Sequence, residues 1–385
     1  MILTLVRRKS PATLLALACL SAGDALADEA AAPPARTAGE TRLTSYGEVN
    51  LGVPVQHPEE AVADLRRLVI GLERSVDEDT ELAIELEVEH AVTSADDPGE
   101  VAIEQAFVSR RLGPVWSVRA GLLLVPAGFL NRSHEPTAYH GVERNLVETA
   151  IIPTTWREGG VAVAASTPGG LTVQVGAGTG FDLSRWDAAS TEGQESPLGS
   201  IHQEMALAKA HDPSAYAAID WRGVPGLHLG ASGFVGRASQ GQPGLPLCAV
   251  TLWDLRARWN PGRLEVSALY ARGAFTNSAA FNAPLVGSPT LLPASFDGWY
   301  LEAAYRLWSG ERDAFVPFAR IEQVNTGRSY ADLGPGLTPA ARPTETAVTA
   351  GASYHLGPEV VVKADWQRFD AGDESRVNLG LGWSF

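Results

Sequence analysis

The last eleven residues of the chain, 375–385, alternate apolar side chains with small or polar ones. The apolar positions are Val377, Leu379, Leu381, Trp383 and Phe385. Successive side chains in a β-strand point to opposite faces, so this spacing gives one apolar face for lipid and one polar face for a lumen. A soluble edge strand can show the same spacing, but it rarely ends the chain on an exposed aromatic residue. We interpret the segment as a membrane β-strand, and we expect the barrel-assembly machinery to recognise it through Phe385.

The other end of the chain has the features of an export signal. Residues 1–27 begin with Arg7, Arg8 and Lys9, continue with an apolar run and end in Ala-Leu-Ala. This order is typical of a secretory signal peptide, and the run is shorter than the about 20 apolar residues of a membrane-spanning helix. The sequence therefore predicts cleavage before Asp28. A lipoprotein anchored through Cys19 is the alternative.

Composition narrows the possible partners. The chain carries 45 acidic against 30 basic residues, a formal net charge of −15, which disfavours nucleic acid as a partner. Cys248 is the one cysteine that would remain after cleavage, so an internal disulfide is excluded. No later run of 18 apolar residues occurs. A membrane-spanning chain of this kind must therefore be a closed β-barrel, because only helices and closed barrels satisfy every backbone group in lipid.

Segments with strand-like alternation recur along the whole chain, and the connections between them are alternately short and long. This pattern predicts an all-β fold, a transmembrane antiparallel β-barrel of about 16 strands with short periplasmic turns and long extracellular loops; fourteen or eighteen strands remain open. We expect a short tail at 28–41 and one barrel at 42–385. The expected strands are 43–53, 65–75, 80–90, 101–111, 116–124, 160–166, 171–178, 216–222, 227–237, 249–259, 264–275, 296–307, 314–325, 346–356, 359–369 and 375–385.

Aromatic residues lie near the ends of these segments on the face that would meet lipid. Such residues form the interfacial girdles of membrane barrels, whereas in a soluble sandwich they would belong to a core. We expect the girdles to contain Trp116, Trp253, Trp259, Trp299, Tyr305, Tyr354, Trp366 and Trp383.

A stretch in the middle of the chain resembles a known family. The motifs are EQAF at 104–107, RAGLLLVPAGFLN at 119–131, HEP at 134–136, GVER at 141–144, VET at 147–149 and IPTTWREGG at 152–160. In this order and spacing they are similar to those of the phosphate-selective porin family, porins O and P, of Gram-negative outer membranes. The resemblance implies a sixteen-stranded, usually trimeric diffusion channel whose third extracellular loop folds into the lumen.

The third long loop of the predicted barrel, 125–158, falls within this stretch and is far longer than a strand connection needs. We expect it to fold inward and narrow the channel. Its charges could set a transverse field across the constriction or could pair within the loop, and both interpretations stay open. The charged or titratable candidates are Arg132, His134, Glu135, Arg144, Glu148, Arg157 and Glu158.

The wall of the predicted lumen carries both signs of charge. Parity along the strands places Arg110, Arg119, Arg256 and Arg258 inside, and it places Glu85 and Glu87 inside on the strand at 80–90, whose inner face is a row of glutamates. The chain departs from the family in its lysines, because only Lys209 and Lys363 follow the signal peptide. Passage of anions such as phosphate, a preference for cations and a solute-specific pore are therefore all open.

Enzyme chemistry is not expected. The histidines are mostly isolated in loops, no G-x-S-x-G motif occurs, and His134, Glu135 and His140 match no zinc signature. We predict no catalytic residue, cofactor or metal. The expected partners are outer-membrane lipid, small ions or solutes in transit, the assembly machinery and two further copies of the chain. A non-conducting structural or adhesive barrel is the remaining alternative.

Overall fold

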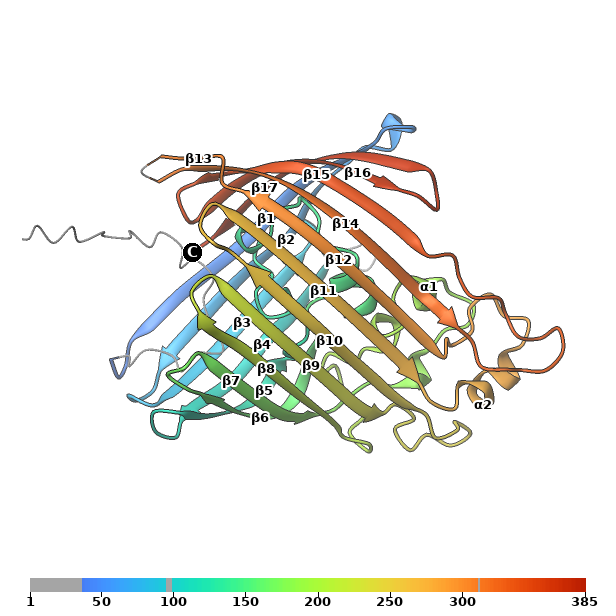
Figure 1. Cartoon of the computed structure of the whole chain (residues 1–385). Coiled ribbons are helices and arrows are strands. Elements are labelled where there is room, and N and C mark those ends of the chain that lie inside the picture. The colour runs from blue at the N-terminus through green and yellow to red at the C-terminus, as the bar shows by residue number, and fades with distance from the viewer. Residues whose placement is uncertain (1–36, 95–98, 311) are drawn as a thin grey trace, which may run out of the picture.

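The computed structural model describes residues 37–94, 99–310 and 312–385. They form a single antiparallel sheet that closes on itself, because β1 pairs with both β2 and β17 (Figure 1). The all-β barrel predicted from the sequence is confirmed. The predicted signal peptide at 1–27, Cys19 and most of the predicted tail lie outside the described residues.

The barrel wall starts one residue before the predicted boundary. Its strands are β1 (Thr41–Pro54), β2 (Val62–Ser75), β3 (Thr80–Glu89), β4 (Glu100–Arg111), β5 (Trp116–Leu124), β6 (Arg157–Ser166), β7 (Leu171–Gly178), β8 (Ser214–Val224), β9 (Leu227–Arg237), β10 (Ala249–Trp259), β11 (Leu264–Phe275), β12 (Ser295–Tyr305), β13 (Trp308–Ser309), β14 (Ala314–Ser329), β15 (Glu345–Leu356), β16 (Val360–Phe369) and β17 (Glu374–Ser384).

The two-residue strand β13 does not add a seventeenth wall element. Both β12 and β13 pair with β14, and β13 continues the line of β12 beyond a short break. The wall therefore has sixteen strands, as the alternation predicts. The loop predicted at 125–158 ends earlier than expected. Strand β6 already begins at Arg157, so Arg157 and Glu158 belong to the wall.

Side chains alternate between the two faces of the wall. On β10, Trp253 and Leu255 are exposed on the outside, whereas Asp254 and Arg256 between them are buried inside. This is the arrangement of a barrel that faces lipid outside and a polar lumen inside. Five of the eight predicted girdle residues, Trp116, Trp253, Trp259, Tyr305 and Trp366, are among the exposed large hydrophobic residues. Trp299, Tyr354 and Trp383 are half-buried. No helix of the described residues has the length and apolar character needed to span a membrane.

The two ends of the barrel differ. The short turns lie at one end, which we call the turn end, together with the first and last residues of the wall, Thr41 and Ser384. The long connections lie at the opposite end, which we call the loop end (Figure 1). In the described part of the chain, the helices of the long connections are short: η1 (Pro58–Glu60), η2 (Pro136–Ala138), η3 (Val147–Ile151), η4 (Leu183–Arg185), α1 (Glu192–Glu195), η5 (Gly199–Ile201), α2 (Ser278–Asn282) and η6 (Ala283–Leu285).

An apolar core at the loop end fixes these connections to the wall. Trp156, at the end of the third loop, is fully buried and packs against Phe181 and Phe234, with ring centroids 5.1 and 4.8 Å away. Phe181 belongs to the loop after β7, and Phe234 belongs to β9. The long loops are thus packed elements of the barrel interior, which allows them to position polar side chains.

Candidate functional site

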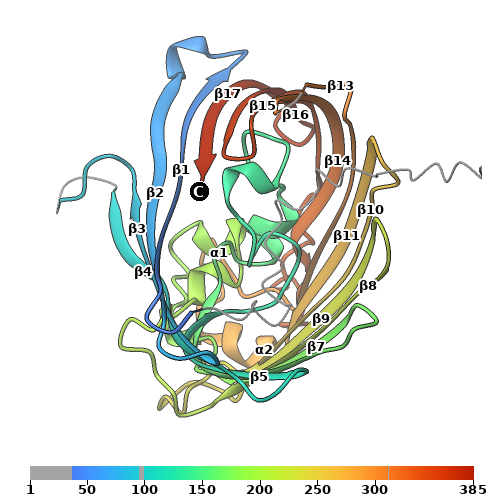
Figure 2. The ribbon, with the colours of Figure 1, turned by 90° about the vertical axis from the view of Figure 1, so that its left-hand side faces the viewer.

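The segment between β5 and β6, residues 125–156, lies inside the ring of strands (Figure 2). We call it the inward loop. Its helix η2 packs against β1, β16 and β17, and its helix η3 packs against β11, β12 and β14. The loop therefore crosses the lumen from the β5–β6 side to the opposite wall and narrows it, as a constriction loop would.

His134 attaches the first part of the inward loop to the wall. Its Nε2 lies 3.0 Å from Oε1 of Glu104 on β4 and 2.6 Å from the hydroxyl of Tyr46 on β1. Burial alone would lower the pKa of His134, but the carboxylate of Glu104 outweighs it and raises this pKa to about 9. His134 is thus a charged structural contact between the loop and the wall.

Glu148 braces the inward loop from within. One carboxylate oxygen accepts hydrogen bonds from the backbone N–H groups of Phe129 and Leu130, the latter at 2.6 Å. The other accepts from Asn145 at 2.8 Å and from the hydroxyl of Tyr300 on β12 at 3.2 Å. Burial raises the pKa of Glu148. All of its acceptor capacity is used by the fold, so its role here is structural.

Gly128 makes room for this brace. It has φ of +67°, and a Cβ built there would lie 2.2 Å from Oε1 of Glu148. Both the backbone conformation and the space require glycine. The glycine of the Pro-Ala-Gly sequence at 126–128 is thereby explained.

The middle of the inward loop is held by β15 and β16. The ammonium group of Lys363 donates to the carbonyl of Gly141 at 2.8 Å, and the backbone N–H of Val142 donates to Oδ2 of Asp365 at 2.6 Å. Ser353 donates to the carbonyl of His140 at 2.9 Å. Lys363, one of the two lysines that follow residue 27, is therefore engaged with the loop backbone.

On the β8–β10 wall, arginines are matched with buried carboxylates. Arg256 lies between Asp254 and Asp220, with N–O distances of 2.7 and 2.8 Å. Arg132 of the inward loop approaches the second oxygen of Asp220 at 3.3 Å. Two carboxylates and two guanidinium groups thus form one network between the loop and the wall.

The same matching recurs at other lumenal arginines. Four of them have at least one carboxylate within ion-pair distance, which offsets their positive charge. The pairs are Arg67–Glu48 at 2.9 Å, Arg157–Glu204 at 3.1 Å, Arg258–Glu265 at 3.7 Å, Arg320–Glu302 at 3.2 Å and Arg320–Glu322 at 3.0 Å.

One candidate from the sequence is misplaced. Arg110 points to the outside of the wall at the turn end, where its guanidinium group lies 3.4 Å from Asp77 and is 53% exposed. The register of β3 and β4 shifts between Glu85 and Leu86, so β4 contains one extra residue near Glu104. This β-bulge reverses the parity of the residues after it, which strict alternation does not anticipate.

The other candidates have different surroundings. Glu158 is buried beneath the loops, where it accepts from Thr179 and from the backbone of Gly180, both at 2.6 Å. Arg144 is bonded to Thr154 and Thr155 inside the inward loop. In the lumen, Arg119 lies over the ring of Phe107, Arg258 lies over that of Phe129, and Glu85 accepts from Gln105. Glu135 lies half-buried beside His134.

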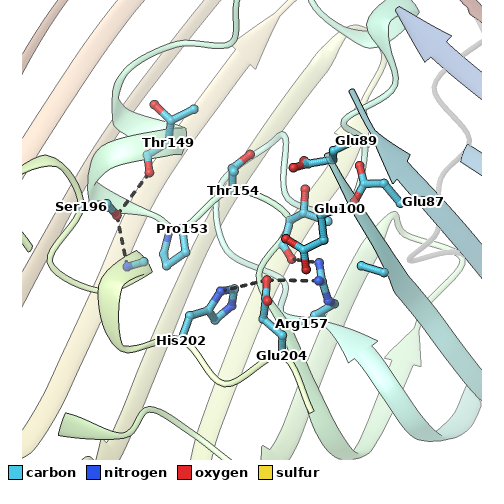
Figure 3. A pocket seen from close by; sticks show the side chains of 13 residues that line it. Glu87, Glu89, Glu100, Thr149, Pro153, Thr154, Arg157, Ser196, His202 and Glu204 are labelled. Atoms are coloured by element: carbon cyan, nitrogen blue, oxygen red, sulfur yellow. Dashed lines mark hydrogen bonds and ion pairs between the residues drawn. The ribbon is translucent and has the colours of Figure 1, made fainter. Parts of the chain in front are cut away.

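A cavity of about 270 Å³ opens where β3, β4, the end of the inward loop and the loop after β7 meet (Figure 3). We call it the rim cavity. Glu87, Glu89 and Glu100 lie on its strand side, and Ser196 and His202 lie on its loop side. Its remaining lining residues are Ala102, Thr149, Pro153, Thr154, Thr155, Arg157, Gly199 and Glu204.

Four residues of these sites were not singled out from the sequence: Glu100, Asp220, His202 and Glu204. Asp220 could have been found, because it shares the inward parity of Tyr216 and Ala218 on β8. His202 and Glu204 lie in the loop after β7, and no sequence signal indicates that this loop returns to the end of β6. Among the described residues, no group of three or more His, Cys, Asp or Glu side chains is placed to hold a metal ion.

Comparisons with known proteins agree with this architecture. No family model matches the chain. An uncharacterised protein of Aquifex aeolicus is 26% identical over 365 residues, which cover 89% of this chain and 79% of that protein. Among solved structures, OmpF of Salmonella typhi in complex with daunomycin matches with a TM-score of 0.62 and 12% identity, over 90% of this chain and 98% of that one.

This chain has the porin fold. The anion-selective porin of Comamonas acidovorans matches with a TM-score of 0.57 and 12% identity, over 90% of this chain and all of that one. OprB of Pseudomonas putida matches with a TM-score of 0.56 and 12% identity, over 90% and 94% of the two chains. The neighbours differ in their described properties and share the barrel. Membership of the phosphate-selective family stays a prediction.

Proposed function

We propose that the protein is an outer-membrane porin, a water-filled channel for passive diffusion of ions and small hydrophilic solutes. The observation that carries the proposal is the inward loop, which crosses the lumen of a closed sixteen-strand barrel and is fixed to its far wall by Lys363 and Asp365. A rigid constriction in a polar lumen filters by size and charge without a moving part. We further propose that three copies of the barrel form a homotrimer in the outer membrane, and that the barrel-assembly machinery recognises the C-terminal segment formed by β17 and Phe385.

The charges support a preference for cations over phosphate. The lumenal arginines Arg67, Arg256 and Arg320 are all matched with carboxylates. Glu87, Glu89 and Glu100 line the rim cavity and have no ion-pair partner among the described residues. Carboxylates focused in a channel mouth raise the local cation concentration. Passage of phosphate would need free cationic groups, which the paired arginines supply poorly.

Two measurements test the channel itself. The protein, refolded in detergent, is added to a planar bilayer, and we expect stepwise increases of current in KCl. Liposomes that contain it should swell in small sugars at a rate that falls with sugar size. The heat-denatured protein is the control. Absence of both signals would overturn the porin proposal in favour of a structural or adhesive barrel.

A further inference from the structure

The strand side of the rim cavity brings three acidic side chains, Glu87, Glu89 and Glu100, together at one lining. In the register of β3 and β4, Glu89 stands directly opposite Glu100, and Glu87 lies on the same face two residues earlier. Like charges directly opposite each other on neighbouring strands are destabilising. Among the described residues none of the three glutamates has an ion-pair partner. The repulsion would be relieved by a cation between them.

Buried polar atoms without partners mark the same cavity. Glu87 is only 3% exposed, and its Oε1 has no hydrogen-bond partner. Arg157 Nε and His202 Nε2 also lack partners among the described residues, and both side chains line the rim cavity. A buried polar atom left unpaired is destabilising, because it has lost its hydrogen bonds to water without replacement. Three such atoms around one polar cavity indicate a place for a hydrogen-bonding ligand.

The chemistry of the lining favours a ligand that donates hydrogen bonds. His202 Nδ1 lies 3.4 Å from Glu204, and burial, aided by Arg157 and Arg185, lowers the pKa of His202 to about 3. A neutral imidazole carries one ring proton. With that proton on Nδ1, facing Glu204, the Nε2 atom of His202 can accept a hydrogen bond. Glu204 also neutralises Arg157 at 3.1 Å. The cavity therefore combines three carboxylates and a neutral imidazole acceptor with the N–H donor of Arg157 Nε.

We propose that the rim cavity binds a small organic cation rich in N–H donors, a primary ammonium or guanidinium compound, between Glu87, Glu89 and Glu100. The proposal deepens the porin function and rests on it, because the cavity lies at the loop end of the channel and would hold the cation before the constriction. The volume of about 270 Å³ suits a solute smaller than a typical drug. The absence of a metal-holding cluster among the described residues favours an organic cation.

Equilibrium binding in detergent tests the cavity independently of conductance. Isothermal titration of the full barrel with guanidinium chloride at constant ionic strength should show saturable binding. Tetramethylammonium has the same charge and no N–H donor, so we expect it to bind at least tenfold more weakly. Equal affinity for the two ions, or no saturable binding of guanidinium, would overturn the proposal.

A charge-matched pair of variants locates the site. Glu87→Gln with Glu100→Gln should weaken guanidinium binding at least tenfold. Glu59→Gln with Glu60→Gln removes the same charge from the exposed helix η1 at the same end of the barrel and should leave binding unchanged. Equal loss in both variants would mean that only the general field of the rim attracts the cation, and the specific site would be overturned.

The bilayer then separates the two proposals. Millimolar guanidinium added from the loop end should interrupt the KCl current of the wild type and not that of the Glu87→Gln/Glu100→Gln variant. KCl steps without any block would remove the rim site and leave the porin intact. Guanidinium binding in detergent without KCl steps would instead keep the cavity and remove the porin.

Discussion

The two sides of the barrel interior use the same charged residue types in opposite ways. On the β8–β10 side, Arg256 is buried between two carboxylates, and the loop arginine Arg132 completes the network. On the β3–β4 side, Glu87, Glu89 and Glu100 face a cavity without a cationic partner among the described residues. A buried charge with its counter-ion belongs to the structure, whereas an acidic side chain that lines a cavity without an ion-pair partner is available to a solute.

Breaking the paired side should have the largest effect. Arg256→Ala leaves Asp220 and Asp254 buried with one counter-ion fewer, and we expect a loss of about 3–5 kcal/mol in the free energy of unfolding. Urea unfolding in detergent, followed by the heat-modifiable mobility of the barrel on gels, measures it. The control Glu100→Gln should change stability by no more than about 0.5 kcal/mol. Equal losses would contradict the distinction between the two sides.

Releasing the inward loop should have the next largest effect. Glu148→Ala removes the acceptor for Phe129, Leu130 and Asn145, and we expect a loss of at least about 2 kcal/mol in stability. The loosened loop should also increase single-channel conductance. Glu148→Gln keeps part of the acceptor capacity and should fall between the wild type and the alanine variant. Unchanged conductance in the alanine variant would remove the loop from the constriction.

The contact of His134 with Glu104 should depend on pH. The folded pKa of His134 is raised to about 9 from an ordinary value near 6.5. The contact therefore contributes its full stability below about pH 6.5 and loses it as the pH rises through about 9. We expect current noise from the inward loop to increase between pH 8 and pH 10. His134→Gln should abolish this pH dependence, and the same profile in that variant would assign it to another group.

Arg144 should have the smallest effect. It is bonded to Thr154 and Thr155 within its own loop, so it pairs internally instead of facing a solute. We expect Arg144→Ala to change stability by about 0.5 kcal/mol or less and to leave ion selectivity unchanged. A shift of the zero-current potential in this variant would return Arg144 to the constriction and favour the transverse-field interpretation.

The wall could be predicted from the sequence because apolar side chains recur at every second position along the strands. Segments such as 116–124 and 249–259 match their observed bounds, and parity places Glu87 and Arg256 correctly. Arg110 was misplaced because a β-bulge needs one extra residue on β4, and periodicity alone does not reveal it.

The loop contacts could not be predicted for a different reason. Val142 meets Asp365, which is 223 residues away, and such contacts follow from closure of the barrel instead of a local pattern. Likewise, only the folded loop after β7 brings Glu204 to Arg157. The motifs around 125–158 indicate that a loop enters the lumen, but the partners of each loop charge depend on the opposite wall.

The most direct test of this account is the zero-current potential across a bilayer with a KCl gradient. The wild type should show a cation-biased potential that phosphate does not alter. The Glu87→Gln/Glu89→Gln/Glu100→Gln variant should move toward an unselective potential, and the Glu59→Gln/Glu60→Gln control should not. An anion-biased potential with block by phosphate would contradict the account, because it would mean that the paired arginines still govern passage.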